Sequence, residues 1–251
     1  PEMLEGMADA HLVFALANCN VERFLTYREA HGEAFDALLD EAEAEGCAVA
    51  AWYSFNPTTV PGVMGVNNGA LRGVGNLDGT DPGDLTLAER VGIRVAVDFV
   101  RLVRAKGVPG LEDCHLIRAG SAVGVRDTRR IVGEYVVTVE DARTGSEFDD
   151  VVARKYGAID ANQLYIGEMA SGFGYPYRSM LPLGVENLLA AGRCGSATFL
   201  GHAAGKSMGN MMALGHAAGV AAALSSHAGV APRALPVDRV QAALRAMNVP
   251  L

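Results

Sequence analysis

The sequence predicts an α/β fold, in which helices and short strands alternate along a chain of 251 residues. Three long segments have the apolar spacing or the small apolar composition of helices, and they cover residues 21–46, 86–106 and 207–227. Short apolar segments lie between them, at 48–55 and within 115–139. Half of the residues are hydrophobic and 20% are charged, as in an ordinary globular protein.

The first third of the chain predicts one helix, one strand and a long connection. The helix over 21–46 ends at Gly46. Its apolar face comprises Phe24, Tyr27, Phe35, Leu38 and Leu39. "AVAAWYSF" at 48–55 reads as a buried strand. Residues 56–83 are rich in Gly, Asn, Asp and Pro and predict an ordered loop region.

The middle of the chain predicts a second helix and several short strands. Thr86 and Glu89 in "TLAE" have the spacing of a capping box, so we expect a helix from there to about Lys106. The segments "HLIRAG", "AVGVR" and "EYVVTV" between Cys114 and Val139 predict strands. "SEFDDVVARKYG" at 146–157 predicts a short helix that stops at its glycine.

The last third predicts a strand, a glycine-rich loop and two helices. Residues 176–186 predict a loop, and "NLLAAG" at 187–192 predicts a short apolar strand. A long helix of small residues follows over 207–227. A closing amphipathic helix begins at Pro236.

Charge and cysteine usage narrow the class of protein. The net charge is −8 and no basic block is present, which argues against nucleic acid and against an anionic membrane surface as partners. The four cysteines are far apart and form no C-x-x-C, which indicates reduced thiols and a cytoplasmic protein without a metal site. We expect no leader and no membrane span, because the most apolar stretch, 211–224, is too short and is interrupted by glycines.

The stretch "FLGHAAGKSMGN" at 199–210 is close to a phosphate-binding loop but does not fit one. The pattern G-x-x-x-x-G-K-[ST] requires a glycine at position 200, where this chain has Leu200. A helix that begins near Ser207 still presents free N–H groups and a partial positive charge. The small residues of this stretch let a flat ligand approach closely, although composition by itself favours tight helix–sheet packing as their explanation.

Several stretches together resemble the C-terminal part of the FAD-dependent oxidoreductases of the FAD_oxidored family. The longest, "NLLAAGRCGSATFLGHAAGKSMGNMMALGHAAGVAAAL", matches the family pattern without a gap, and "GVRDTRRIVGEYVVTVED", "PYRSMLP" and "DGTDPGDLTLAE" agree with it. The resemblance covers most of residues 78–251. It implies that the C-terminal strand, loop and helix complete a Rossmann-like FAD domain and that the helix start faces the pyrimidine side of the flavin.

The resemblance also implies the domain organisation and the cofactor contacts. Residues 1–183 would form an α+β substrate-binding domain, a mixed sheet with helices, and residues 184–251 the C-terminal part of the FAD-binding domain. The residues implied to bind FAD are Gly192, Arg193, Cys194, Gly205, Lys206, Ser207, Met208, Gly209 and Asn210.

One part of the family's FAD site has no counterpart in the sequence. No stretch has the spacing of G-x-G-x-x-G, which seats the FAD pyrophosphate. We therefore expect a partner, a second polypeptide that supplies the ADP-binding Rossmann half. A cleaved precursor and a partial chain are the other two explanations.

The resemblance implies four candidate catalytic residues, and each has a structural alternative. His202 could accept a substrate proton, or it could be a packing histidine. Lys206, where the family commonly has arginine, could balance an anion or be solvated. Tyr177 and Arg178 could hold a substrate oxygen, or Arg178 could form a structural ion pair. The family's usual histidine after "SAT" is replaced by Phe199.

The function implied is hydride transfer between a small organic substrate and FAD N5, by a chain that is a subunit or a C-terminal part of the enzyme. The alternative is a non-catalytic subunit that stabilises a partner flavoprotein.

Overall fold

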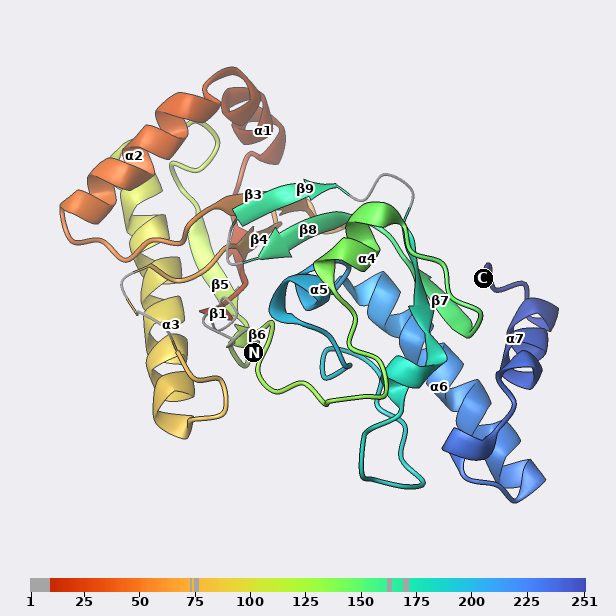
Figure 1. Ribbon diagram of the computed structural model, residues 1–251. Helices are drawn as coiled ribbons and strands as arrows, with labels where there is room; N and C mark the ends of the chain where they lie inside the picture. The colour runs from red at the N-terminus through yellow and green to blue at the C-terminus, as the bar shows by residue number, and fades with distance from the viewer. Residues whose placement is uncertain (1–9, 73, 75–76, 162–163, 169–171) are drawn as a thin grey trace. The chain divides into compact units, whose positions relative to one another are not determined.

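The computed structural model describes residues 10–72, 74, 77–161, 164–168 and 172–251. These residues form two compact units, 10–128 and 129–251. Both units contain helices and strands (Figure 1), which confirms the predicted α/β class. The division at residue 129 reflects contacts within each unit and does not test the predicted functional boundary at residue 184, which stays a prediction.

The first unit is built on a four-stranded antiparallel sheet in the order β3–β4–β2–β5. The strands are β2 (Phe14–Ala17), β3 (Tyr53–Pro57), β4 (Met64–Asn68) and β5 (His115–Ala119). β1 (Ala10–His11) pairs separately with β6 (Gly124–Val125). The prediction of a loop over 56–83 was wrong for β4, because Val66 pairs with Phe14 on one side and Phe55 on the other.

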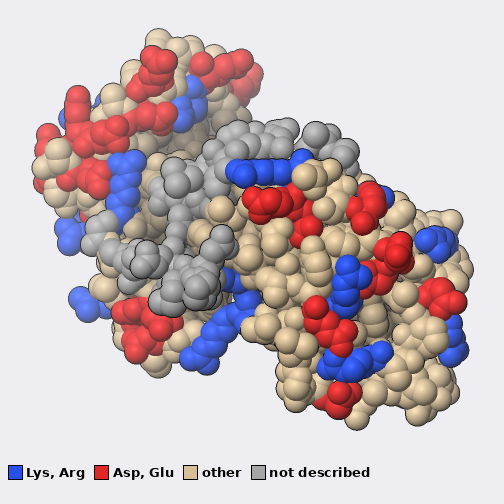
Figure 2. All heavy atoms as spheres, viewed as in Figure 1, with Lys and Arg blue, Asp and Glu red and all other residues tan. Residues whose placement is uncertain are grey.

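Three helices cover this sheet: α1 (Val21–Ala30), α2 (Gly32–Ala44) and α3 (Pro82–Ala105). The helix predicted over 21–46 is thus confirmed as two, which meet at His31. Five phenylalanines from the sheet and the helices form the core, with ring centroids 4.7–6.4 Å apart. They are Phe14, Phe24, Phe35, Phe55 and Phe99. Acidic side chains gather over α1 and α2 on the face shown in Figure 2.

The start of α3 differs from the predicted capping box. Asp81 caps the helix, because its carboxylate accepts hydrogen bonds from the backbone N–H groups of Gly83 and Asp84. Pro82 follows at the first helical position, where its fixed φ is favourable. Thr86 lies one turn inside the helix and donates its hydroxyl to the Pro82 carbonyl at 2.7 Å. The prediction of Thr86 as the cap was therefore wrong by one turn.

We expect Asp81→Ala to lower the stability of the unit 10–128 by about 1 kcal/mol, because two N–H groups lose their acceptor. Trp52 is the single tryptophan of the chain and lies in this unit, so urea unfolding followed by its fluorescence measures the effect. Thr86→Ala is the matched control and should change stability less. A larger loss of stability in Thr86→Ala than in Asp81→Ala would contradict Asp81 as the cap and would support the predicted capping box.

The second unit holds two antiparallel strand pairs and four α-helices among its described residues. β7 (Val151–Lys155) pairs with β10 (Phe173–Pro176), and β8 (Ala158–Ala161) pairs with β9 (Leu164–Glu168). The helices are α4 (Val139–Thr144), α5 (Phe199–Ala203), α6 (Met208–Ala228) and α7 (Val237–Ala246). Two 3₁₀ turns lie at Tyr177–Met180 and Pro232–Ala234.

Three local predictions in this unit were wrong. "EYVVTV" forms only isolated bridges, because Thr138 and Asp141 make a capping box that starts α4. The helix predicted over 146–157 is replaced by β7, whose pairing with β10 outweighs its local pattern. The strand predicted over 187–192 is absent, since Asn187 and Gly192 have φ of 55° and 100° and turn the backbone.

The two C-terminal helices are confirmed. α6 begins after Ser207 and ends at Gly229, which has the left-handed φ of 66° that glycine tolerates. α7 begins after Pro236. Leu214, Ala217 and Ala221 of α6 and Val240 and Leu244 of α7 are buried in the core of this unit.

Candidate functional site

The Gly-Lys-Ser stretch forms a turn between two helices. Thr198 caps α5 by accepting from the Gly201 N–H at 3.1 Å. Gly205, with φ of +85°, then reverses the chain, and Ser207 precedes the first residue of α6. A phosphate loop connects a strand to a helix, whereas here a one-turn helix precedes the turn. The structure therefore agrees with the exclusion of a phosphate loop.

The start of α6 is open at its surface. The Ser207 side chain makes no capping hydrogen bond, so it leaves the first-turn N–H groups uncapped. Met208 is 84% exposed, and a Cβ at Gly209 would meet no atom within 4 Å among the described residues. The end of α6 thus presents backbone donors and a partial positive charge on a slim, accessible surface.

Asn210 fixes this helix start to the end of β7. Its amide nitrogen donates to the Tyr156 carbonyl at 2.8 Å, and its amide oxygen accepts from the Tyr156 N–H at 3.3 Å. The Asn210 side chain is buried, so both backbone groups of Tyr156 depend on it for their hydrogen bonds. Asn210 therefore acts from below as a support for the turn, not as an exposed ligand group.

We expect Asn210→Ala to destabilise the second unit by about 1 kcal/mol, because two part-buried backbone groups of Tyr156 lose their partners. Hydrogen exchange should rise at the Tyr156 amide and in the first turn of α6. Met212→Ala, at a position that is 75% exposed on the same helix, is the control and should leave both regions protected. Equal exchange in the two variants would contradict the support role.

A buried pair, Lys155 and Tyr175, lies beneath the turn. The Lys155 ammonium stands 4.3 Å from the centroid of the Tyr175 ring. A Cβ at Gly205 would lie 3.1 Å from the Lys155 stem, and a Cβ at Gly195 would lie 2.6 Å from the Tyr175 hydroxyl. The two segments predicted to bind FAD, 192–194 and 205–210, are therefore brought to neighbouring parts of one buried pair.

Burial sets the ionisation of this pair. It lowers the pKa of Lys155 to about 7, since a charged ammonium is poorly solvated there. Burial also raises the pKa of Tyr175, against a smaller opposite effect of the Ser179 hydrogen bond. The sequence analysis missed Lys155 as a site residue, because its segment was predicted to be a helix. If "VVARK" is assigned as a strand, Lys155 falls on the same face as Val151 and Ala153, and a lysine on an apolar face would have marked it as a site residue.

The segment 192–194 forms a tight turn. The Gly195 N–H donates to the Gly192 carbonyl at 3.1 Å, and the Cys194 carbonyl accepts from Ile131 at 2.9 Å. Arg193 and Cys194 are exposed. The backbone of this turn is therefore held by hydrogen bonds although both residues are exposed, and the Cys194 thiol donates to the Ala191 carbonyl at 3.6 Å.

His202 and Lys206, both predicted to be catalytic, differ in exposure. The His202 side chain is buried on α5, with 3% of its surface exposed. Lys206 is half-buried in the turn. The roles predicted for both residues stay predictions.

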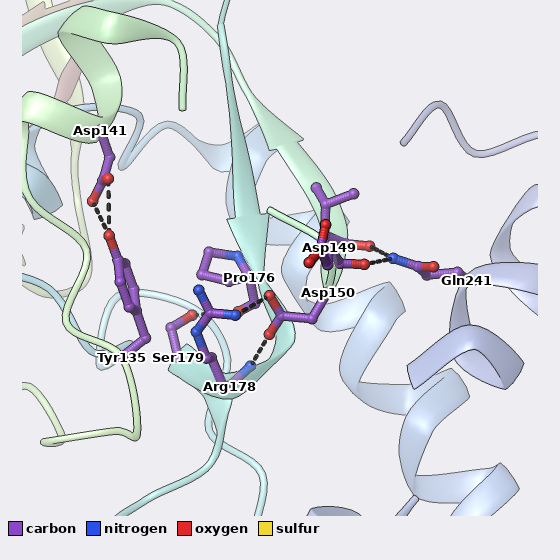
Figure 3. A network of polar contacts seen from close by, with 9 residues as sticks. Tyr135, Asp141, Asp149, Asp150, Pro176, Arg178, Ser179 and Gln241 are labelled. Carbon is purple, nitrogen blue, oxygen red and sulfur yellow. Dashed lines mark hydrogen bonds and ion pairs between the residues drawn. The ribbon is translucent and has the colours of Figure 1, made fainter. Parts of the chain in front are cut away.

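Arg178 belongs to a polar network at the other end of β10 (Figure 3), and the backbone N–H of the preceding residue, Tyr177, donates to the Asp150 carbonyl at 2.8 Å. Asp150 accepts from the Arg178 guanidinium at 2.6 Å and from its backbone N–H at 3.0 Å. The Arg178 guanidinium also lies 4.9 Å from the Tyr135 ring centroid. The Tyr177 hydroxyl donates to the Pro232 carbonyl, and burial raises its pKa to about 12. These contacts favour the structural alternative for both residues, whose catalytic roles stay predictions.

An open hollow of about 670 Å³ lies in the first unit, at the start of α1. Its polar lining includes Asn18, Asn20, Arg23, Glu112 and Asp113. Asn18 has a φ of 57°, which is uncommon for a residue other than glycine. The sequence pattern gave no sign of this hollow, because its walls come from three separate segments.

Two features, a cluster of metal-binding side chains and a helix that could cross a membrane, are absent from the described part of the chain. Its residues do not bring three His, Cys, Asp or Glu side chains together in a way that could hold a metal ion. Its helices are all too short or too polar to cross a membrane.

Comparison with protein families gives a match over most of the chain. The model of the family described as FAD dependent oxidoreductase matches residues 8–244, which is most of the chain. No curated protein and no solved structure matches this chain.

The residues present fit one end of the family's cofactor, FAD. The start of α6, which Ser207 does not cap, would offer backbone donors to the anionic end of a flat ring, and Gly209 leaves room for a close approach. The pyrophosphate end requires a G-x-G-x-x-G turn, which the sequence does not contain. The match over residues 8–244 confirms the family to which the sequence resemblance pointed, and the chain belongs to the FAD dependent oxidoreductase family.

Proposed function

We propose that this chain supplies the substrate-binding part and the flavin-facing segment of an oxidoreductase that transfers hydride between a small organic substrate and N5 of FAD. The observation that carries the proposal is the open start of α6, in a segment where the family resemblance is strongest. FAD would supply the redox chemistry. The chain's residues 205–209 would hold the pyrimidine side of the ring, where a helix start favours negative charge.

Residues of this chain would accept the substrate proton, hold a substrate oxygen and balance negative charge beside the start of α6. His202 would accept the substrate proton, and Tyr177 or Arg178 would hold a substrate oxygen. Lys206 would balance negative charge beside the helix start. Because His202 is buried, its role requires that bound substrate or cofactor reach α5 from the side of the 204–207 turn.

The proposal includes a partner, a second polypeptide with the ADP-binding Rossmann half. The sequence lacks the glycine turn for the pyrophosphate, which is the first support. The composition of α6 is the second. None of its 21 residues is Asp, Glu, Lys or Arg, yet Met208, Met212, Gly215 and Gly219 are exposed. A helix that is apolar on all sides is normally buried on all sides, so a partner that covers this face is expected.

The four cysteines are free and separated, which supports a cytoplasmic location for the proposed complex.

The experiment purifies this chain alone, the partner alone and the two together, and measures bound FAD and turnover. Flavin absorbance and turnover are expected only in the complex. His202→Ala should retain FAD and lose turnover by about 10²–10⁴-fold, as for loss of a general base. His227→Ala, an exposed histidine at the far end of α6, is the matched control and should keep full turnover. Full FAD content and turnover in the partner alone would overturn the proposal and leave the alternative, a stabilising subunit.

A further inference from the structure

Lys155 is the buried lysine of a chain that has only three. Lys106 is exposed, Lys206 is half-buried, and Lys155 is 2% exposed. Successive side chains of β7 point to opposite faces of the strand here. Arg154 reaches outward to Glu147 at 2.7 Å, whereas Lys155 points into the core of the unit.

The surroundings of Lys155 come from three segments. β10 contributes the Tyr175 ring, the turn contributes Gly205, and α6 contributes Asn210, whose amide nitrogen also faces Gly205. The titratable groups nearby are Tyr175, its neighbour Cys194, Tyr156 next in the chain, and Lys206 beside Gly205. None of the ion pairs seen between described side chains neutralises Lys155, and burial lowers its pKa to about 7.

A buried ammonium without a carboxylate partner is sensitive to new negative charge. An anion that arrives within about 6 Å of such a group favours its charged form by about one pKa unit or more. The turn at Gly205–Ser207 lies directly beside Lys155, because the Lys155 stem packs against Gly205.

We propose that Lys155 is a positioning residue that takes up a proton when negative charge develops at the Gly205–Ser207 turn. The inference rests on the proposed function, in which reduced flavin supplies that charge. Substrate would pass two electrons and one hydrogen nucleus to the flavin as hydride, and water would pass one proton to the Lys155 amine. Reoxidation of the flavin by its acceptor would return this proton to water. The positive charge on Lys155 would thereby balance the negative charge of reduced flavin at the Gly205–Ser207 turn.

The first test measures the midpoint potential of FAD in the complex as a function of pH. For a two-electron couple, each coupled proton adds about 30 mV per pH unit, the equivalent of a tenfold change in equilibrium constant. Wild type should show the additional slope above pH 7, the region in which Lys155 is neutral in the oxidised complex. Lys155→Met should lose it, and Lys106→Met, at an exposed lysine of the other unit, should keep it. A packing role alone would not change this slope.

The second test needs no flavin. Carbon-13 labelling of the lysine side chains in the full chain gives three signals to titrate by NMR, and Lys155→Met identifies its own by removal. A midpoint near 7 is expected for this signal. A midpoint near the ordinary lysine value of about 10.4 would overturn the inference.

The outcomes separate the inference from the proposed function. A complex that binds no FAD overturns the proposed function and this inference with it. A complex that binds and reduces FAD with equal slopes in wild type and Lys155→Met overturns only the role of Lys155. Lys155→Met is expected to fold, because methionine has a similar length and no charge to bury.

Discussion

Gly201→Ala is expected to destabilise the unit 129–251 by about 3 kcal/mol or more, because the added methyl group has no space. The new Cβ would lie 2.2 Å from the Val137 carbonyl oxygen and 2.9 Å from the Thr138 Cα, and both are backbone atoms. The Val137 carbonyl also accepts from the Thr198 N–H at 2.8 Å, the bond that holds the start of α5. Relief of the clash would therefore break the attachment of α5 to the start of α4.

Gly219→Ala is the matched control. Gly219 is exposed within α6, and a Cβ there would meet nothing within 4 Å. Alanine should stabilise the helix by about 0.5–1 kcal/mol, since it restricts the unfolded chain. Urea unfolding of the chain by circular dichroism, with segment-resolved hydrogen exchange, measures both changes. Trp52 fluorescence reports on the other unit and should stay unchanged. Gly201→Ala with wild-type exchange in α5 would contradict the expectation.

Lys155→Met is expected to stabilise the chain, and the gain should depend on pH. Burial lowers the pKa of Lys155 from 10.5 to about 7, so the folded state holds this proton less well than the unfolded state. Below pH 7 the folded wild type must bury a charged ammonium, and the destabilisation is fully present. It amounts to a few kcal/mol, up to about 5, at 1.36 kcal/mol per pKa unit.

The gain from Lys155→Met should shrink as the pH rises. Between about pH 7 and 10.5 the folded wild type has released this proton while the unfolded chain still binds it, so wild type gains stability relative to the variant as the pH rises. Urea unfolding of both proteins across this range gives the difference directly, because other titrating groups are common to both. Lys106→Met, at an exposed lysine, should show no such trend. A gain that stays constant with pH would contradict the neutral, buried state of Lys155.

Local patterns predicted some elements well and others badly, for identifiable reasons. α6 was predicted almost to the residue, since its composition permits nothing else over 21 residues and Gly229 marks its end. β7 was predicted as a helix, because its strand character depends on β10, which lies about twenty residues further along. The strand at 187–192 failed because Asn187 and Gly192 adopt positive φ, which an apolar run does not reveal.

Some residues of the candidate site could also be predicted from the sequence, and others could not. Residues 205–210 and 192–194 were found from the resemblance, and the structure brings both segments to the same buried pair. Lys155 and the supporting bonds of Asn210 could not be found, because both require the pairing of β7 with distant segments. The contacts of Arg178 with Asp150 and Tyr135 likewise depend on tertiary structure.

The register of the first unit has a consequence for synthesis on the ribosome. β2 is the inner strand of the four-stranded sheet, and its neighbour β5 lies a hundred residues later, with Leu16 opposite Leu116. A nascent chain that ends before β5 therefore exposes one edge of β2, together with buried residues such as Phe14 and Leu16. Such an edge recruits other strands, and pairings this distant in sequence form slowly. The edge of β2 is thus exposed until His115–Ala119 has been translated, and aggregation of the first unit is expected in that interval.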